Sequence, residues 1–360
     1  MLRSPSFGLL TVVAVVSLVA SAYADKVVLV AGGGMNDGDG HALEVKLQGP
    51  FGVDFDKAGN LYFVEMLGHR VGRVDKNGRL TFIAGTGKKG DVGDNGPALK
   101  AEFNSMHSLA VGPAGNIFIA DTWNNRIRKI DAKTGQITNF AGTGVKGFSG
   151  DGGPAGKAQF GGVYCIAFDP RGEQMYVADL DNRRIRAIDM KTGIVRTVAG
   201  NGEKGIPADR AEAIKAPLLD PRAVGADAKG NIYILERGGH CLRVVDAAGR
   251  IHTVAGTGKQ GATGDGGDAR LAMLNGPKHL CIDRDGSVLI ADTENHVIRR
   301  YIPESGKIVR VAGTGTKGAA GIGGPPDKVE LNQPHGVFVG PQGEIFIADS
   351  SNNRILKITR

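Results

Sequence analysis

The chain contains few cysteines for its length, and this limits the kind of protein it can be. Only three occur among 360 residues, Cys165, Cys241 and Cys281, so they cannot all pair with one another. Their spacing does not match the disulfide framework of a small secreted domain. We therefore expect small buried thiols, with a Cys241–Cys281 bridge as the alternative that the sequence leaves open.

The sequence also lacks an apolar run near its start that is long enough to cross a membrane as a helix. An uncharged, mostly apolar segment covers 13 residues, 8–20, and follows Arg3, and no cysteine for a lipid anchor follows it. Ala22-Tyr23-Ala24 has the small residues of a signal-peptidase site. We predict a signal peptide over residues 1–24, cleaved after Ala24, and a secreted or periplasmic mature protein that does not span the membrane.

Familiar catalytic and phosphate-binding motifs are missing as well. No Gly-x-Ser-x-Gly nucleophile elbow occurs, and Gly142-Thr143-Gly144 is not followed by the helix that a phosphate loop requires. The net charge of +7 could suggest nucleic acid. However, basic segments such as 126–129 and 184–186 recur along the chain instead of forming one patch. Together with the expected export, this distribution argues against nucleic-acid binding.

Glycine, in contrast, is abundant, and its positions reveal a repeat. The chain has 57 glycines, and a segment close to Val-Ala-Gly-Thr-Gly recurs six times at spacings of 53 to 58 residues. A period of this size indicates a repeat architecture. The six copies are marked by Ala31-Gly32, Ala84-Gly85, Ala141-Gly142, Ala199-Gly200, Ala255-Gly256 and Ala312-Gly313.

Each repeat reads as four short strands. In the second repeat they are expected near 108–111, 117–120, 126–130 and 136–140, separated by turn residues. Strands such as 117–120 are apolar on both faces, so both faces must be covered, as they are in radially packed blades. Residues 25–32 match the fourth strand of a repeat, whereas the last repeat has only three. The sequence therefore predicts an all-β, six-bladed β-propeller of four-stranded antiparallel blades, closed by its N-terminal strand.

Four motifs of the repeat resemble those of the NHL-repeat family. They are Pro-x-Gly-Val at 50–53, Asp-x-x-Gly-Asn-Leu-Tyr at 56–62, Ala-Asp-x-x-Asn-Asn-Arg-Ile at 120–127 and Gly-Asp-Gly-Gly-Pro-Ala at 150–155. The resemblance implies one NHL propeller over residues 25–360. The family includes binding platforms, sensor domains and a few lyases and hydrolases, so the resemblance specifies the fold and leaves the function open.

An acidic residue ends the second strand of every repeat, and we interpret this acidic ring as scaffold. A ring of carboxylates could suggest a metal site. However, an acidic residue at a turn can accept backbone N–H groups from its own turn, and arginine follows five residues later in four repeats. We expect the pairs Asp121–Arg126, Asp179–Arg184 and Asp349–Arg354. The ring consists of Glu65, Asp121, Asp179, Glu236, Asp292 and Asp349.

The entrances to the first strands, unlike the acidic ring, differ from repeat to repeat. They are Phe51-Gly52, His107-Ser108, Tyr164-Cys165, Arg222-Ala223, Lys278-His279 and His335-Gly336. We expect them to surround one mouth of the central channel, where mixed aromatic and basic side chains are typical of a ligand site. The predicted site binds a protein, a peptide, or an anionic or carbohydrate-like ligand. Its residues are His107, Tyr164, Arg222, Lys278, His279, His335 and the sole tryptophan, Trp123.

Two mouth segments support an alternative. Residues 106–109 and 334–337 resemble the Pro-His-[Ser/Gly]-Leu segments of the lyase domain of peptidylglycine amidating enzymes, which implies a zinc site with His107 and His335 as ligands. Blade four should supply a third ligand, but it has Arg222, which cannot bind a metal. Calcium at the Gly-Asp-Gly-Gly loops would have one carboxylate per loop. The leading interpretation is a binding module without metal or cofactor, and the alternative is a metal-assisted lyase or hydrolase.

Overall fold

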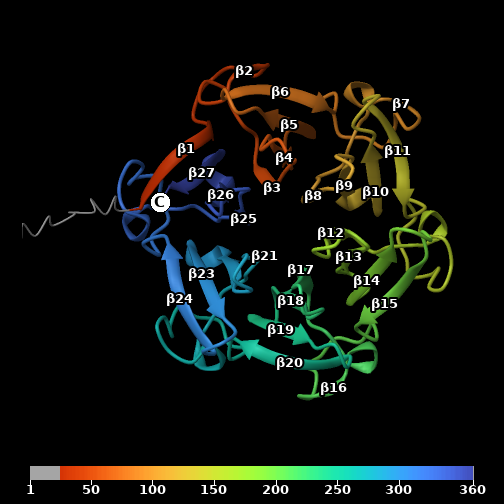
Figure 1. The fold of residues 1–360 in the computed structure, drawn as a ribbon, viewed down its shortest axis with the longest axis vertical. Helices are drawn as coiled ribbons and strands as arrows, with labels where there is room; N and C mark the ends of the chain where they lie inside the picture. The colour runs from red at the N-terminus through yellow and green to blue at the C-terminus, as the bar shows by residue number, and fades with distance from the viewer. Residues whose placement is uncertain (1–24, 360) are drawn as a thin grey trace, which may run out of the picture.

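The computed structural model describes residues 25–359, which form six β-sheets arranged in a ring around a central channel (Figure 1). The predicted signal peptide lies outside the described residues. Each sheet is an antiparallel blade of four strands, and three blades add a two-residue strand at the outer edge. The all-β six-bladed propeller predicted from the repeat is therefore confirmed, with these short extra strands as the addition.

In the first three blades the strands follow one another from the channel outward. Blade one has β3 (Pro50–Phe55), β4 (Leu61–Glu65), β5 (Arg70–Val74) and β6 (Arg79–Ala84), with β2 (Gly40–His41) at the edge. Blade two has β8 (Ser108–Val111), β9 (Ile117–Asp121), β10 (Arg126–Ile130) and β11 (Gln136–Ala141), with β7 (Gly96–Pro97) at the edge. Blade three has β12 (Val163–Phe168), β13 (Gln174–Asp179), β14 (Arg184–Asp189) and β15 (Val195–Ala199).

The last three blades repeat this order. Blade four has β17 (Pro221–Ala226), β18 (Ile232–Glu236), β19 (Cys241–Val245) and β20 (Arg250–Ala255), with β16 (Ala211–Glu212) at the edge. Blade five has β21 (His279–Ile282), β22 (Val288–Asp292), β23 (Val297–Ile302) and β24 (Lys307–Ala312). Blade six has β25 (Gly336–Val339), β26 (Ile345–Asp349), β27 (Arg354–Thr359) and the N-terminal β1 (Lys26–Gly32).

Within the described residues, eight single-turn 3₁₀ helices occupy two kinds of connection. Five lie between one blade and the next: η1 (Ala98–Lys100), η3 (Ala155–Lys157), η4 (Ala213–Lys215), η5 (Ala269–Leu271) and η7 (Pro326–Lys328). Three follow the second strand of a blade: η2 (Thr122–Asn124), η6 (Thr293–Asn295) and η8 (Ser350–Asn352). None of the helices in the described part of the chain has the length and apolar character needed to cross a bilayer.

The propeller closes where the two ends of the chain pair. Strand β1 is antiparallel to β27, with Lys26 opposite Thr359 and a register shift between Leu29 and Ala31. Figure 1 shows β1, in red, beside the blue strands of blade six. The pairing gives blade six the fourth strand that its own repeat lacks, as the incomplete first and last repeats predicted.

The core consists of apolar layers between adjacent blades. Between blades one and two, for example, Val64 and Val71 pack against Ile117 and Ile119, and all four are fully buried. This packing explains why the second strands are apolar on both faces. All three cysteines are free, so the Cys241–Cys281 bridge is not formed. The thiol of Cys241 instead donates to Glu236 Oε2 at 3.2 Å.

Candidate binding site at one mouth of the channel

The acidic ring fixes the loop that leads into the mouth. Each of its six carboxylates is fully buried and accepts a backbone N–H from the loop before its own first strand. Asp121, for example, accepts from the N–H of Asn104 at 2.8 Å. Our expectation that these donors belong to each residue's own turn was therefore wrong. The ring instead ties the end of one strand to the loop that carries the mouth residues.

Arginines complete this scaffold. The expected pairs Asp121–Arg126 and Asp349–Arg354 are present, at 3.8 and 2.6 Å. The predicted pair Asp179–Arg184 was wrong. Arg186 lies 3.5 Å from Asp179, and Arg184 donates to backbone carbonyls instead.

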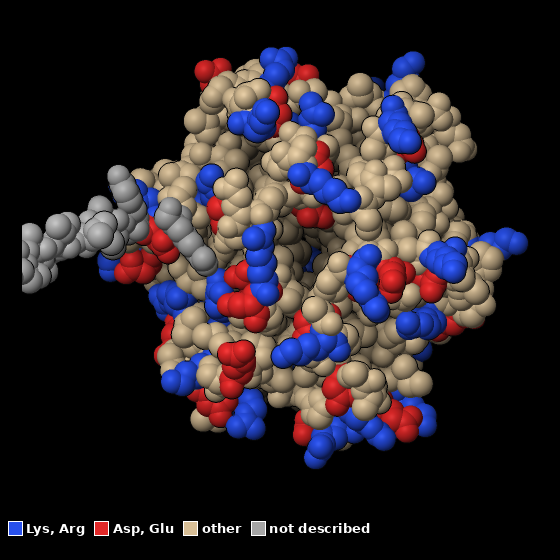
Figure 2. All heavy atoms as spheres, in the orientation of Figure 1, with Lys and Arg blue, Asp and Glu red and all other residues tan. Residues whose placement is uncertain are grey.

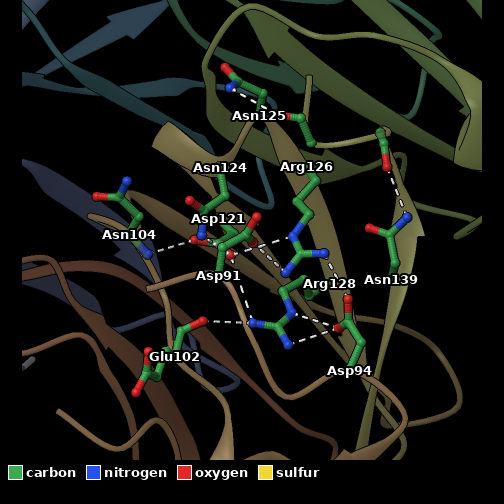
Figure 3. Close-up of polar contacts among 12 residues, drawn as sticks. Asp91, Asp94, Glu102, Asn104, Asp121, Asn124, Asn125, Arg126, Arg128 and Asn139 are labelled. Carbon is green, nitrogen blue, oxygen red and sulfur yellow. Dashed lines mark hydrogen bonds and ion pairs between the residues drawn. The ribbon is translucent and has the colours of Figure 1, made fainter. Parts of the chain in front are cut away.

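Figure 3 shows the network in blade two, where the guanidinium of Arg128 bridges Asp94 and Asp121 at 2.8 and 3.9 Å. The fully buried Arg128 also donates to the carbonyl of Glu102 at 2.8 Å. The buried charges of the scaffold are thus paired and hydrogen-bonded, as burial requires.

The loop before each first strand has the same backbone conformation in all blades. Two residues before every entrance residue, the backbone is left-handed, with φ between 48° and 77°. These positions are Gly49, Ser105, Gly162, Asp220, Gly276 and Gln333. The residues that follow them two positions later are therefore structurally equivalent, although their side chains differ. We call these six the mouth ring: Phe51, His107, Tyr164, Arg222, Lys278 and His335.

Neighbouring blades are linked at these same left-handed positions. The N–H of Gln333 in blade six donates to Nδ1 of His296 in blade five at 3.1 Å, and the N–H of Gly276 donates to His240 in the same way. Asn125 and Asn353 fill the equivalent position at two other junctions, where their Oδ1 atoms accept the same bond. His240 and His296 thus join neighbouring blades.

Four mouth-ring side chains form a continuous aromatic wall. Phe51 stacks on His335 with ring centroids 4.2 Å apart and meets His107 edge-on at 5.0 Å. His107 in turn contacts Tyr164 at 4.7 Å. Phe51 is one of the entrance residues but was not part of the predicted binding set. Its contacts with both histidines add it to the candidate site.

Two cations complete the ring. The guanidinium of Arg222 lies 4.0 Å from the centre of the Tyr164 ring, within cation–π distance. Lys278 Nζ pairs with Glu294 Oε1 at 2.8 Å and reaches His335 Nε2 at 3.0 Å. Glu294 lies in η6, in the connection after the second strand of blade five. The structure shows that it neutralises the lysine.

Both mouth histidines are held as neutral rings. Nδ1 of His107 lies 2.8 Å from the carbonyl oxygen of Ser105, and Nδ1 of His335 lies 2.8 Å from that of Gln333. A carbonyl only accepts, so each Nδ1 carries the proton. Burial, followed by the charge of Arg222, lowers the pKa of His107 well below its ordinary value. For His335 burial is again the main cause, followed by Lys278.

The remaining two predicted residues lie apart from the ring. Trp123 is on η2 and 51% exposed, and its Nε1 donates to the hydroxyl of Tyr164 at 3.4 Å. It therefore flanks the mouth, as expected. His279 instead faces the next blade, where its ring is 4.5 Å from that of Phe338 and its Nδ1 accepts from the N–H of Val337 at 3.5 Å. It lines a cavity of about 470 Å³ formed by the inner strands.

The two histidines proposed as zinc ligands are separated by an aromatic ring. Phe51 contacts both His107 and His335, and Nε2 of His335 is engaged by Lys278. Within residues 25–359, no group of three or more His, Cys, Asp or Glu is arranged to hold a metal ion. Figure 2 shows one face of the disc, hollowed at its centre, with basic and acidic side chains intermingled over all the blades.

Comparison with known proteins places these features in a family. A model of the NHL repeat matches residues 103–130 and 331–358, and a model of the teneurin NHL domain matches residues 157–263. Protein SUPPRESSOR OF QUENCHING 1, chloroplastic, from Arabidopsis thaliana is 27% identical over 331 residues, which cover 89% of this chain and 31% of that protein. NHL repeat-containing protein 2 from Bos taurus is 25% identical over 336 residues, covering 85% and 46%.

This chain thus spans about a third to a half of the length of these relatives. Among solved structures, an auxiliary nutrient binding protein from Bacteroides thetaiotaomicron superposes with a TM-score of 0.68 at 16% identity, covering 93% of this chain and 76% of that one. At this identity the superposition shows the fold alone. The matched repeats, the repeat-containing relatives and the closed ring of six blades show that the chain is an NHL-repeat β-propeller.

Proposed function

We propose that this propeller is a binding module that captures a ligand or a partner at the mouth ring, after export from the cytoplasm. The observation that carries the proposal is the mouth ring itself. Six structurally equivalent positions hold five different kinds of side chain, and those of Phe51, His107, Tyr164 and Arg222 touch one another in sequence around the channel. A purely structural ring has no need for such variety.

Two further points support binding over catalysis. NHL propellers are typical protein-binding scaffolds, which makes a binding role the default for the family. The similar Bacteroides structure is described as a nutrient-binding protein. A mouth with aromatic walls and a few polar groups suits either a small molecule or the end of a peptide.

The proposal is tested with a panel of neutral sugars, short peptides and small organic acids. Binding is followed through the emission of Trp123, the only tryptophan of the chain, which lies beside the mouth. We expect at least one compound to bind, and the triple variant His107→Ala, Arg222→Ala, His335→Ala to lose that binding while keeping its circular dichroism spectrum. Equal affinity in the folded triple variant would remove the mouth as the site.

Export is tested separately, since it rests on residues 1–24 alone. Expression of the full chain with its own N-terminus in a bacterial host is expected to yield a protein whose first residue is Asp25, as shown by intact mass. A product that retains residues 1–24 in the cytoplasm would contradict the export proposal and leave the binding proposal standing.

A further inference from the structure

Arg222 differs from every other buried arginine in the described part of the chain. Seven arginines between residues 25 and 359 are at most 9% exposed. Six of them form ion pairs: Arg126, Arg128, Arg186, Arg243, Arg299 and Arg354. Arg222, at 7% exposed, has neither an ion pair nor a side-chain hydrogen bond with any residue in this range. None of its nitrogens is both fully buried and without a hydrogen-bond partner, so its N–H donors reach the solvent and are available to a ligand that the chain itself does not supply.

The charges around Arg222 leave one positive charge at the mouth. Lys278 is paired with Glu294 at 2.8 Å, and Arg237 with Asp220 at 3.4 Å. His107 and His335 are neutral, because their Nδ1 protons face carbonyl oxygens and burial opposes a second proton. The three cations and two carboxylates therefore leave the single charge of Arg222 without a counter-charge. A monoanion would balance it, whereas a dianion such as a phosphate monoester would leave a surplus of negative charge.

The shape of the site narrows the monoanion further. One face of the guanidinium is covered by the ring of Tyr164 at 4.0 Å, which leaves its edge to donate. The edge of a guanidinium matches the two oxygens of a carboxylate through a pair of parallel N–H···O bonds. Aromatic rings of Phe51, His107 and Tyr164 line the same mouth. An apolar or aromatic group beside the charged end of the ligand would pack against them.

Resting on the binding role proposed above, we propose that the mouth binds a carboxylate through Arg222, with an apolar group of the ligand against Phe51 and Tyr164. The carboxylate belongs either to a small organic acid or to the C-terminus of a peptide. In both cases Arg222 supplies the charge and the paired donors, and the aromatic wall supplies the apolar contact. The bound carboxylate provides the partner that Arg222 lacks within the chain.

The test uses N-acetylphenylalanine and its amide, which differ only in the carboxylate. Titration followed by Trp123 emission is expected to give roughly tenfold to a hundredfold tighter binding of the acid, the range for a hydrogen bond to a charged group. Arg222→Gln should abolish this preference, and Arg222→Lys should restore only part of it. Arg171→Gln, the same change of charge at a 78% exposed residue of the β12–β13 hairpin, is the matched control.

Two further probes separate the sources of the carboxylate. A pentapeptide with a free C-terminus that binds more tightly than N-acetylphenylalanine would assign the site to peptide ends. Equal or weaker binding would assign it to small acids. The same pentapeptide with an amidated end and an internal aspartate is expected to bind no better than its aspartate-free form, because the aspartate lacks the terminal apolar group beside its carboxylate.

Each contrary result has its own meaning. If acid and amide bind equally, or if Arg222→Gln keeps the preference while folded, the carboxylate assignment is wrong although the mouth still binds. If inorganic phosphate binds more tightly than N-acetylphenylalanine, the charge argument is wrong. If neither the probes nor any compound of the broader panel shows binding that is lost in the mouth variants, both the carboxylate site and the proposed binding role are wrong.

Discussion

The acidic ring and the mouth ring each contribute one residue per blade, and they follow opposite rules. Every member of the acidic ring is a fully buried carboxylate that accepts a backbone N–H at 2.7 or 2.8 Å. The mouth ring holds five kinds of side chain in its six positions, and one of these side chains is a cation without a counter-charge. The shared environment of the acidic ring requires a carboxylate in every blade, whereas the mouth positions share a backbone conformation but no side-chain partner that is common to all six.

The comparison shows what the repeat reveals within one chain. A side chain that satisfies a backbone group present in every blade cannot change without leaving that group unpaired. A side chain at the channel mouth does not pair with such a backbone group, so it can be replaced by one that binds a ligand. The acidic ring therefore reports on stability and the mouth ring on binding.

The difference between the two rings is tested most directly by replacing one buried arginine beside each of them. Arg128→Gln should lower the free energy of unfolding by about 2–3 kcal/mol, because it removes one of the two guanidinium groups that balance Asp121 and Asp94, and only Arg126 remains beside them. Arg222→Gln removes a buried charge that has no counter-charge, so the free energy of unfolding of this variant should equal or exceed that of the wild type. Urea denaturation measures both, and similar losses in the two variants would show that the rings do not differ as described.

A second prediction uses pH. Burial lowers the pKa of His279 to about 4, while the unfolded chain takes up that proton near pH 6.5. The stability that His279 contributes is therefore complete above pH 6.5 and is lost as the pH falls toward 4. Burial instead raises the pKa of Asp121 to about 6, and this carboxylate has the opposite effect between pH 6 and 3.8.

The two effects are separated by comparing the wild type with His279→Gln at each pH. The carboxylate contributions cancel in the difference, so the wild type should lose roughly 2 kcal/mol more than the variant between pH 7 and pH 5. Urea unfolding at pH 7, 6 and 5 measures this loss. A constant difference across this range would mean that His279 titrates normally in the folded protein.

The smallest expected effect concerns the links between blades. His296 has φ of 56° and accepts the N–H of Gln333. His296→Ala should cost about 1–2 kcal/mol, from the lost hydrogen bond and the left-handed backbone. His296→Asn should be nearly neutral, since Asn125 and Asn353 make the same contact at other junctions. Thermal unfolding of the two variants checks this, and equal midpoints would remove the linking role.

The repeat predicted the number of blades, the four inner strands and the closing strand because these depend on periodic apolar and glycine positions. It also located the mouth ring, since equivalent offsets become equivalent places in a ring of equal blades. It misplaced the donors to Asp121, because they come from a loop 17 residues earlier that meets the turn only in the folded blade. Pairings between side chains that do not recur from blade to blade, such as Lys278 with Glu294, had no periodic signal.

The pairing of β1 with β27 has a consequence for how the protein is made. The hydroxyl of Thr359 donates to the carbonyl of Lys26 across 333 positions of the chain. On the ribosome, β1 has no partner until β27 has been synthesised. Blades one to five are each complete before that moment. The ring therefore stays open while these five blades are made and closes only when β27 has emerged.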